Sequence, residues 1–267
     1  MKTDLFWDKS CKGKDKSDEM PHLWGNIVFC VLRPIMLIFR LNSKNKENLR
    51  LLQNKTGAVV IANHVSFLDV FCMYLSIRLK QWPRFIAREN LWDHKALGFL
   101  LSRCGAFPIK RDTADKKAIK RAAKMLKNNE IVGIMPEGTR RGKSDKTPSL
   151  HAGAAFIARL GGNVPIIPCT TINAEKVKEK GKFVRFPKIT VAFGDPILLE
   201  DFDFLPKEQR LEACTWYALR ESFAMFYSCE PKEVDMVALF PENTDFTEEF
   251  NNNPIPKHKS CDLIKRK

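Results

Sequence analysis

Residues 57–62 form a short, uninterrupted apolar run, and the chain changes character immediately after it. A run of this length predicts a buried strand. The apolar residues of 67–79 then recur at helical spacing. A buried strand that passes directly into a helix is typical of α/β sheets, so this stretch predicts a sheet covered by helices.

The alternation of short apolar runs with amphipathic segments continues through most of the chain. Further strands are predicted at 84–87, 105–111 and 131–135, a helix or loop at 91–104, and helices at 113–129, 151–160 and 206–227. A chain of 267 residues is long enough for one α/β domain with an appended element at either end. We therefore predict an α/β fold, with a mixed, mostly buried sheet flanked by helices, over residues 54–228.

Two apolar runs of the second half are less regular. The run 164–170 carries Pro165 and Pro168, so an ordinary central strand is not expected throughout it. Residues 183–186 and 189–193 are expected to form a hairpin or two sequential strands.

The two ends of the chain differ from the domain between them. Residues 1–20 are polar and rich in lysine, which predicts a flexible N-terminus. Residues 229–267 are polar and finally basic, and are expected to be a flexible arm or an additional membrane contact.

The most hydrophobic stretch, residues 23–41, lies within a predicted N-terminal membrane-associating helical element, 21–53. It is interrupted by Arg33 and Pro34 and ends near Arg40. A spanning helix needs about 20 nearly uninterrupted apolar residues, and an arginine at mid-span costs roughly 2.5 to 3.5 kcal/mol. We therefore expect a monotopic element whose apolar side enters the headgroup region. A core helix of the domain and a true span are the alternatives.

Charge and cysteine usage limit the partners and the compartment. Forty-five Lys and Arg against 31 Asp and Glu leave a net charge of +14, which favours anionic partners: nucleic acid, an acidic membrane face or phosphorylated substrates. The eight cysteines include no C-x-x-C pair, and Cys30, Cys72, Cys104 and Cys169 fall in apolar runs. They are expected to be small buried side chains in a reducing compartment, without a disulfide framework or metal cluster.

His64 and Asp69 lie where the first strand is expected to pass into its helix. The crevice beyond the carboxyl ends of strands is where α/β sheets bind ligands, and an imidazole with a carboxylate partner removes protons near neutral pH. The same residues allow another interpretation. Ser66 followed three positions later by Asp69 fits a helix capping box, in which the carboxylate only satisfies a backbone donor. The spacing alone does not separate the two.

Two other predicted strands also end in polar residues. The run 105–111 ends with Lys110 and Arg111, and the run 131–135 is followed by Pro-Glu-Gly-Thr-Arg, residues 136–140. A glycine lets a substrate approach the backbone, and an arginine offers a planar fork suited to phosphate. We expect the three strand ends to converge on one site.

The motifs together resemble the PlsC-like family of glycerolipid acyltransferases, of the lysophosphatidate acyltransferase type. N-H-V-S-F-L-D at 63–69 is similar to the family's H-x4-D motif. Three later blocks resemble the family's further blocks in the same order: G-A-F-P-I-K-R at 105–111, P-E-G-T-R at 136–140 and V-P-I-I-P at 164–168. Four ordered blocks are far more specific than one. The chain departs from the family pattern at His151, where a lysine is more usual.

The resemblance implies transfer of an acyl group from acyl-CoA or acyl carrier protein to the sn-2 hydroxyl of lysophosphatidic acid. The product would be phosphatidic acid, made for phospholipid biosynthesis without a cofactor beyond the acyl donor. His64 would be the general base, oriented by Asp69. Arginines would hold the acceptor's phosphate, and the residues around them would shape the pocket. The residues implied in substrate binding are Asn63, Arg111, Glu137, Gly138, Thr139 and Arg140.

Other function classes fit the sequence less well. A nucleic-acid-binding module predicts aromatic residues interleaved with cations or a docking helix, and a phosphohydrolase needs a metal cluster or nucleophile motif; none is evident. Another lysophospholipid or alcohol acceptor and a non-catalytic membrane-binding relative remain alternatives. The expected partners are an anionic membrane surface, the lysophospholipid and the acyl donor. The expected location is the cytoplasmic face of a bacterial inner membrane.

Overall fold

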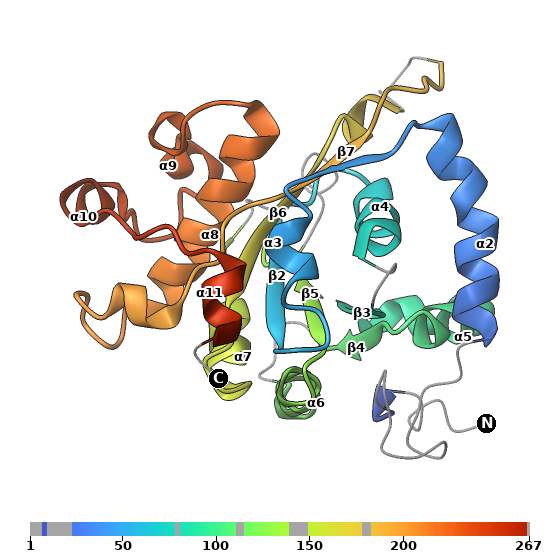
Figure 1. Ribbon diagram of the computed structural model, residues 1–267, viewed down its shortest axis with the longest axis horizontal. Coiled ribbons are helices and arrows are strands. Elements are labelled where there is room, and N and C mark those ends of the chain that lie inside the picture. Colours follow the sequence, from blue (N-terminus) through green and yellow to red (C-terminus); the bar gives the residue numbers. More distant parts are fainter. Residues whose placement is uncertain are drawn as a thin grey trace.

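A seven-stranded sheet with the order β1-β7-β6-β2-β5-β3-β4 forms the centre of the molecule (Figure 1). The computed structural model describes residues 7–9, 23–77, 81–110, 115–138, 149–177 and 183–265. The strands are β1 (Asn42–Lys44), β2 (Ala58–Ala62), β3 (Pro83–Arg88), β4 (Phe107–Ile109), β5 (Ile131–Ile134), β6 (Ile166–Ile172) and β7 (Thr190–Phe193). Strands β6 and β7 pair antiparallel, and the other neighbouring pairs are parallel. The predicted mixed α/β sheet is confirmed.

Helices cover both faces of this sheet. One face packs against α6, α7 and α8, and the other against α2, α3 and α4. The longer helices are α2 (Leu23–Ile38), α4 (Leu68–Ile77), α5 (Lys95–Arg103), α6 (Lys116–Lys127), α7 (Gly153–Leu160) and α8 (Arg210–Tyr227). The shorter ones are α3 (Glu47–Arg50), α9 (Met236–Leu239), α10 (Thr247–Asn252) and α11 (Ser260–Lys265). The described residues also contain four 3₁₀ turns: η1 (Glu89–Trp92), η2 (Ala174–Val177), η3 (Leu199–Phe202) and η4 (Pro231–Glu233).

The central strand β2 explains how one apolar run supports both layers. Val59 and Ile61 belong to the cluster under α6, α7 and α8, whereas Ala58, Val60 and Ala62 belong to the cluster under α3 and α4. Successive side chains of a strand point to opposite faces, so a strand covered on both sides must be apolar throughout. All of these side chains are fully buried.

Strand β6 begins after Pro165, as its prolines lead one to expect, but it runs through Pro168, where the expected interruption is absent. Its residues pair with β2 from Val59↔Ile166 to Ala62↔Cys169. The reason is local: pairing with β7 begins only at Cys169, and the Pro168 carbonyl accepts from Gly194 N, just beyond the end of β7. Residue 168 therefore lies opposite Gly194. The Gly194 carbonyl, to which proline cannot donate, accepts a hydrogen bond of 2.9 Å from Asn48 Nδ2 instead, so no acceptor is left without a donor and the strand continues.

Two other expectations are wrong. Residues 183–186 form no strand, and β7 is the only strand between them and α8. The expected hairpin is absent because this segment extends away from the sheet with exposed side chains. Cys30 is exposed rather than buried, because it lies on the outward side of α2, whereas Cys72 and Cys169 are buried as expected and Cys104 partly so.

The C-terminal segment is packed on the domain and is not a flexible arm. Phe240, Phe246 and Phe250 are almost completely buried in the cluster around α8. Farther along, His258 Nε2 lies 2.8 Å from Asp201 Oδ1, and the Ser260 hydroxyl donates to the Asn48 carbonyl. The C-terminal segment is therefore anchored to the core by aromatic side chains that are spaced through a polar sequence.

The described part of the N-terminus is also docked. The indole of Trp7 donates to Ser102 Oγ at 3.0 Å and packs edge-on against Trp92. The guanidinium of Arg84 donates to the carbonyls of Trp7 and Lys9. Most of the predicted flexible segment 1–20 lies outside the described residues.

Helix α2 presents apolar side chains on two opposite sides. Phe29, Leu32 and Met36 pack against the sheet cluster. Leu23 and Val31, eight residues apart, are 66% and 65% exposed, and Ile27 and Ile38 continue the same stripe. The helix has 16 residues and contains Pro34. Within the part of the chain that the structure describes, no helix combines the length and apolar character needed to cross a bilayer.

The turn before β2 gives a test of the fold. A Cβ atom at Gly57 would lie 2.2 Å from the carbonyl oxygen of Leu126, which is backbone and cannot rotate away. We expect Gly57→Ala to lower the free energy of unfolding by about 1 to 3 kcal/mol, measured by urea denaturation. The matched control is Gly153→Ala, where an added Cβ meets nothing within 4 Å. Equal stability losses in the two variants would contradict this packing.

Candidate functional site

The register of the two central parallel strands brings His64 and Glu137 together. Ile61 of β2 lies opposite Ile134 of β5, and each of the two polar residues follows three positions later. Neighbouring parallel strands end at the same edge of a sheet, so residues that follow a register pair by the same number of positions lie close together there. The Glu137 Oε1 atom accepts a hydrogen bond of 2.8 Å from the backbone N–H of His64. This contact holds the two strand-end turns against each other.

The imidazole of His64 contacts the carboxylate of Asp69. Nδ1 of the histidine lies 3.1 Å from Oδ2 of the aspartate, whose side chain is 1% exposed. Asp69 belongs to the first turn of α4, while His64 lies in the preceding turn outside the helix. This arrangement lets residues five apart meet, which a regular helix would prevent because they would point about 140° apart.

The same carboxylate also caps the helix. Oδ2 of Asp69 accepts from the backbone N–H groups of Val65 and Ser66, at 2.9 and 2.8 Å. The Ser66 hydroxyl in turn accepts from Leu68 N. The capping interpretation and the catalytic-pair interpretation of the sequence are therefore both present in the geometry, and one oxygen serves both.

This arrangement fixes how the His64 ring is used. An oxygen that already accepts two amide hydrogens is placed as an acceptor for Nδ1–H as well. The proton then sits on Nδ1, and Nε2 is left with its lone pair. The ring is 17% exposed, so a hydroxyl group can approach Nε2 from the edge of the sheet. These are the requirements for a general base.

Asn63, which follows β2, is hydrogen-bonded to β6, the neighbour of β2 on the side away from β5. Its Oδ1 accepts a hydrogen bond of 2.7 Å from the hydroxyl of Thr170 on β6. Both side chains are buried, and Asn63 Nδ2 has no hydrogen-bond partner among the described residues. Sequence analysis missed Thr170 because it is far along the chain. Its only signal was a hydroxyl residue within an apolar strand.

The turn after β5 contains the glycine that the motif requires. Gly138 has φ of 66°, in the left-handed region that favours glycine, and its N–H donates to the Met135 carbonyl. Glu137 beside it is 3% exposed and points inward to His64 N. The next two predicted site residues, Thr139 and Arg140, lie outside the described residues.

The third strand end, after β4, lies farther from His64. Strand β4 is three positions from β2 in the sheet order, which corresponds to about 14 Å at the usual strand spacing. Lys110 follows β4, is exposed, and has its Nζ 3.8 Å from Glu89 Oε1. Arg111 lies outside the described residues. The parallel strands confirm that the three ends share one edge.

Two cysteines lie near the histidine and aspartate, but neither is an activated nucleophile. Burial, and to a smaller extent the negative charge of Asp69, raises the pKa of Cys72 to about 12 and raises that of Cys169 as well. Both thiols therefore stay protonated at neutral pH, and only a thiolate is strongly nucleophilic. Neither thiol therefore supplies a nucleophile at this edge.

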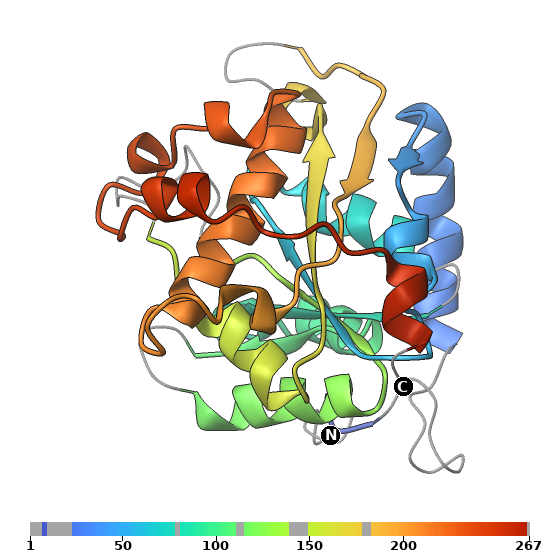
Figure 2. The ribbon, with the colours of Figure 1, turned by 60° about the vertical axis from the view of Figure 1, so that its left-hand side comes forward.

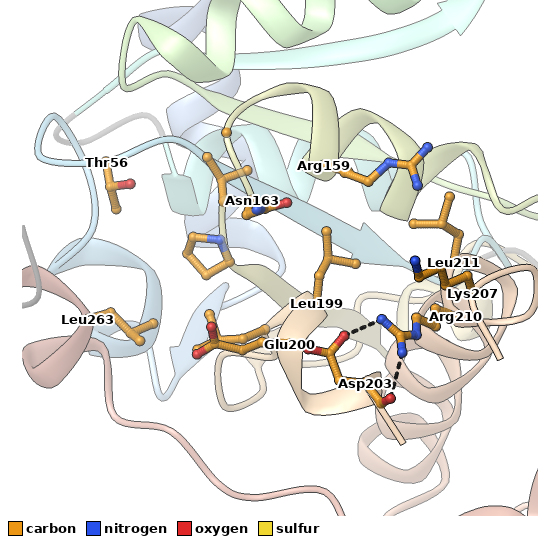
Figure 3. A pocket seen from close by; sticks show the side chains of 14 residues that line it. Thr56, Arg159, Asn163, Leu199, Glu200, Asp203, Lys207, Arg210, Leu211 and Leu263 are labelled. Carbon is orange, nitrogen blue, oxygen red and sulfur yellow. Dashed lines mark hydrogen bonds and ion pairs between the residues drawn. The ribbon is translucent and has the colours of Figure 1, made fainter. Parts of the chain in front are cut away.

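A separate cavity of about 600 Å³ lies at the opposite edge of the sheet (Figure 3). Thr56, which precedes β2, and Pro165, which precedes β6, line it. Arg210 on its wall is paired with Asp203 at 2.5 Å. None of the predicted site residues that the structure describes lines this cavity, so it is distinct from the edge that carries His64.

Comparison with known proteins shows the family of the chain. The acyltransferase family profile matches residues 40–172. The chain is 34% identical over 171 residues to the 1-acyl-sn-glycerol-3-phosphate acyltransferase of Bacillus subtilis, covering 64% of this chain and 80% of that protein. This chain belongs to the PlsC-like family of glycerolipid acyltransferases. The resemblance expected from the four motifs is confirmed.

More distant relatives extend the comparison. A chloroplastic 1-acyl-sn-glycerol-3-phosphate acyltransferase of Arabidopsis thaliana is 28% identical over 192 residues, which cover 70% of this chain and 50% of that protein. The crystal structure of the 1-acyl-sn-glycerophosphate acyltransferase PlsC from Thermotoga maritima superposes with a TM-score of 0.51 at 20% identity, covering 76% of this chain and 77% of that one. That likeness shows the shared acyltransferase fold.

The Asn63 contact can be tested by removing one hydroxyl. Thr170→Val leaves Asn63 Oδ1 buried without its donor, and we expect the free energy of unfolding to fall by about 1 to 3 kcal/mol. The neighbouring Thr171→Val is the matched control, because that hydroxyl is also buried but has no hydrogen-bond partner among the described residues. We expect the control to be as stable as the original or more so. Chemical denaturation of both variants measures the difference, and equal losses would argue against the contact.

Proposed function

We propose that the protein transfers an acyl group from an acyl thioester to the free sn-2 hydroxyl of lysophosphatidic acid, giving phosphatidic acid. The observation that carries this proposal is the contact between His64 Nδ1 and Asp69 Oδ2 at the carboxyl edge of the sheet. Relatives named 1-acyl-sn-glycerol-3-phosphate acyltransferase support the choice of acceptor. The proposed product, phosphatidic acid, is a precursor for phospholipid biosynthesis.

The proposed chemistry needs no covalent enzyme intermediate. Nε2 of His64 takes the proton of the acceptor hydroxyl as its oxygen attacks the thioester carbonyl. A C–O bond forms, and the C–S bond breaks when the tetrahedral intermediate collapses. The departing thiolate takes up the proton from the imidazolium, which restores the base. Asp69 keeps Nδ1 protonated and stabilises the positive ring while it exists.

The acceptor's phosphate is assigned to cations that follow the neighbouring strand ends. Arg111 and Arg140 are proposed to bind it, since a guanidinium matches phosphate geometry. Gly138 and Thr139 are proposed to shape the pocket around the glycerol. Glu137 supports the same pocket from beneath, through its hydrogen bond to the backbone of His64. Asn63 has a supporting role through its buried contact with Thr170.

We further propose that α2 associates with the membrane that contains the acceptor. The exposed stripe of Leu23, Ile27 and Val31 supports this, because a helix packed on a core through one side has no reason within the domain for a second apolar side. Exposed Arg33 and Arg40 suit an anionic headgroup layer. The proposed location is the cytoplasmic face of a bacterial inner membrane. The acyl donor is either acyl-CoA or acyl carrier protein, and no other cofactor is proposed.

Removal of the base is the most direct test of the proposed reaction. His64→Ala should lower kcat by about 10² to 10⁴-fold, the usual contribution of a general base. Acyl transfer to a panel of lysophospholipids, with both donor types and product detection by mass, measures it. His94→Ala is the control, since that imidazole is exposed and makes no capping hydrogen bond. Near-normal turnover by His64→Ala would remove the histidine from the base role.

Binding of the phosphate gives a second, separable prediction. Arg140→Ala should raise the KM for lysophosphatidic acid by roughly 10 to 100-fold, the loss expected for a charge-assisted hydrogen bond. The KM for the acyl donor should change little. Arg159→Ala, an exposed arginine that lines the cavity at the opposite edge, serves as the control. An effect confined to the donor would contradict the assignment of Arg140.

A further inference from the structure

The segment after η2 exposes large apolar side chains without any enclosing contact from the sheet. Phe183 is 95% exposed, and Val184 and Phe186 are 53% and 56% exposed. Scattered single apolar residues on a surface are ordinary, but three within four positions form a patch. In Figures 1 and 2 this segment projects from the end of the molecule between β6 and β7. Such an exposed apolar patch indicates a surface that binds a partner or a membrane.

The patch lies at the same edge of the sheet as the proposed catalytic histidine. Strand β6 runs parallel to β2 and is its direct neighbour, so the connection that leaves the end of β6 emerges beside the turn that carries His64. Neighbouring strands are about 5 Å apart. Phe67, three residues after His64, is another exposed aromatic residue at this edge, with 60% of its surface accessible.

Backbone hydrogen bonds fasten the segment to the end of α2. The Ile189 N–H donates to the Phe39 carbonyl, and the Asn42 N–H donates to the Ile189 carbonyl. The guanidinium of Arg40 donates to the carbonyl of Phe186 at 3.2 Å. The rings of Phe39 and Phe186 lie 5.7 Å apart. The exposed patch is therefore connected to the residues that directly follow α2.

The charges around the patch identify the kind of surface it fits. Arg40, Arg185 and Lys188 are exposed beside the apolar residues. Aromatic side chains flanked by cations are typical of segments at the interface of an anionic bilayer, where rings enter the headgroup level and cations meet lipid phosphates. The outward stripe of α2 continues the apolar surface as far as Ile38, which is 53% exposed.

We propose that residues 183–188 are a second membrane contact, which enters the headgroup region of an anionic bilayer beside the outer side of α2. Two contacts joined at a fixed angle hold the molecule in one orientation, whereas a single helix lying on the surface leaves rotation about its axis free. The catalytic edge then faces the bilayer. The orientation of this edge towards the bilayer rests on the proposed function, because it matters only for an acceptor that is a membrane lipid. Binding of residues 183–188 to the bilayer does not depend on the proposed function.

Vesicle co-sedimentation of the full chain tests the contact directly. The vesicles contain phosphatidylcholine, with or without phosphatidylglycerol as the anionic component. Phe183→Ser should weaken binding to the anionic vesicles by roughly tenfold or more, the loss expected when a buried aromatic side chain is removed. Phe183→Trp should bind as the original does, with indole emission shifted to shorter wavelength on the vesicles. Arg185→Glu should weaken binding to the anionic vesicles and have little effect on the neutral ones.

A matched pair of valines supplies the control. Val184 and Val237 are exposed to nearly the same extent, 53% and 51%, but Val237 lies on α9, which packs on the other face of the sheet. Val184→Ser should weaken vesicle binding by roughly threefold or more, and Val237→Ser should not change it. Equal binding by the original chain, Phe183→Ser and Val184→Ser would overturn the proposal.

An activity assay separates failure of this inference from failure of the proposed function. With a short-chain, water-soluble lysophosphatidic acid in the absence of vesicles, Phe183→Ser should turn over as fast as the original chain. With vesicle-embedded acceptor it should be slower by about the factor by which its binding falls. Loss of turnover on the soluble acceptor would show that Phe183 acts in the site and would overturn the membrane assignment. Absence of acyl transfer by every form would refute the proposed function, while the vesicle binding measurements would still decide the contact.

Discussion

One carboxylate oxygen, Oδ2 of Asp69, organises the edge of the sheet that carries the proposed site. It accepts two backbone N–H groups of the preceding turn and faces the Nδ1 atom of His64. The start of α4, the shape of the turn and the orientation of the imidazole therefore depend on the same atom. The arrangement has a cost, because the other oxygen, Oδ1, is buried without a partner among the described residues.

The rest of the edge is built by contacts between strands that are distant in sequence. Glu137 reaches the backbone of His64 from β5, and Thr170 reaches Asn63 from β6. Each contact follows from strand register, since parallel neighbours in a fixed register bring the same offsets together. The histidine turn is thus clamped from both sides by neighbouring strands. A site of this kind is positioned by the sheet and not by the loops alone.

The sequence predicts what depends on local patterns. The apolar run of β2, the helical spacing of α4 and α8 and the polar strand ends are all visible in it, because period and composition are local properties. The course of β6 through Pro168 was not expected, because the tolerance of that proline depends on where β7 ends beside it, which is a matter of sheet order. The C-terminal segment was misjudged because three buried phenylalanines, Phe240, Phe246 and Phe250, are diluted by polar residues. Thr170 was missed because its partner is set by register.

The two-sided packing of α2 has a mechanical consequence. Gly25 on its inner side lies so close to Trp82 that an added Cβ would overlap the indole, and Phe29, Leu32 and Met36 join the cluster beneath the sheet. The helix therefore has no freedom to sink or tilt by itself. Under the proposed membrane contact, the depth of α2 in the lipid layer also sets the height of the His64 imidazole above that layer. Bilayer thickness or lateral pressure would then alter the proposed turnover without a change in any residue of the site.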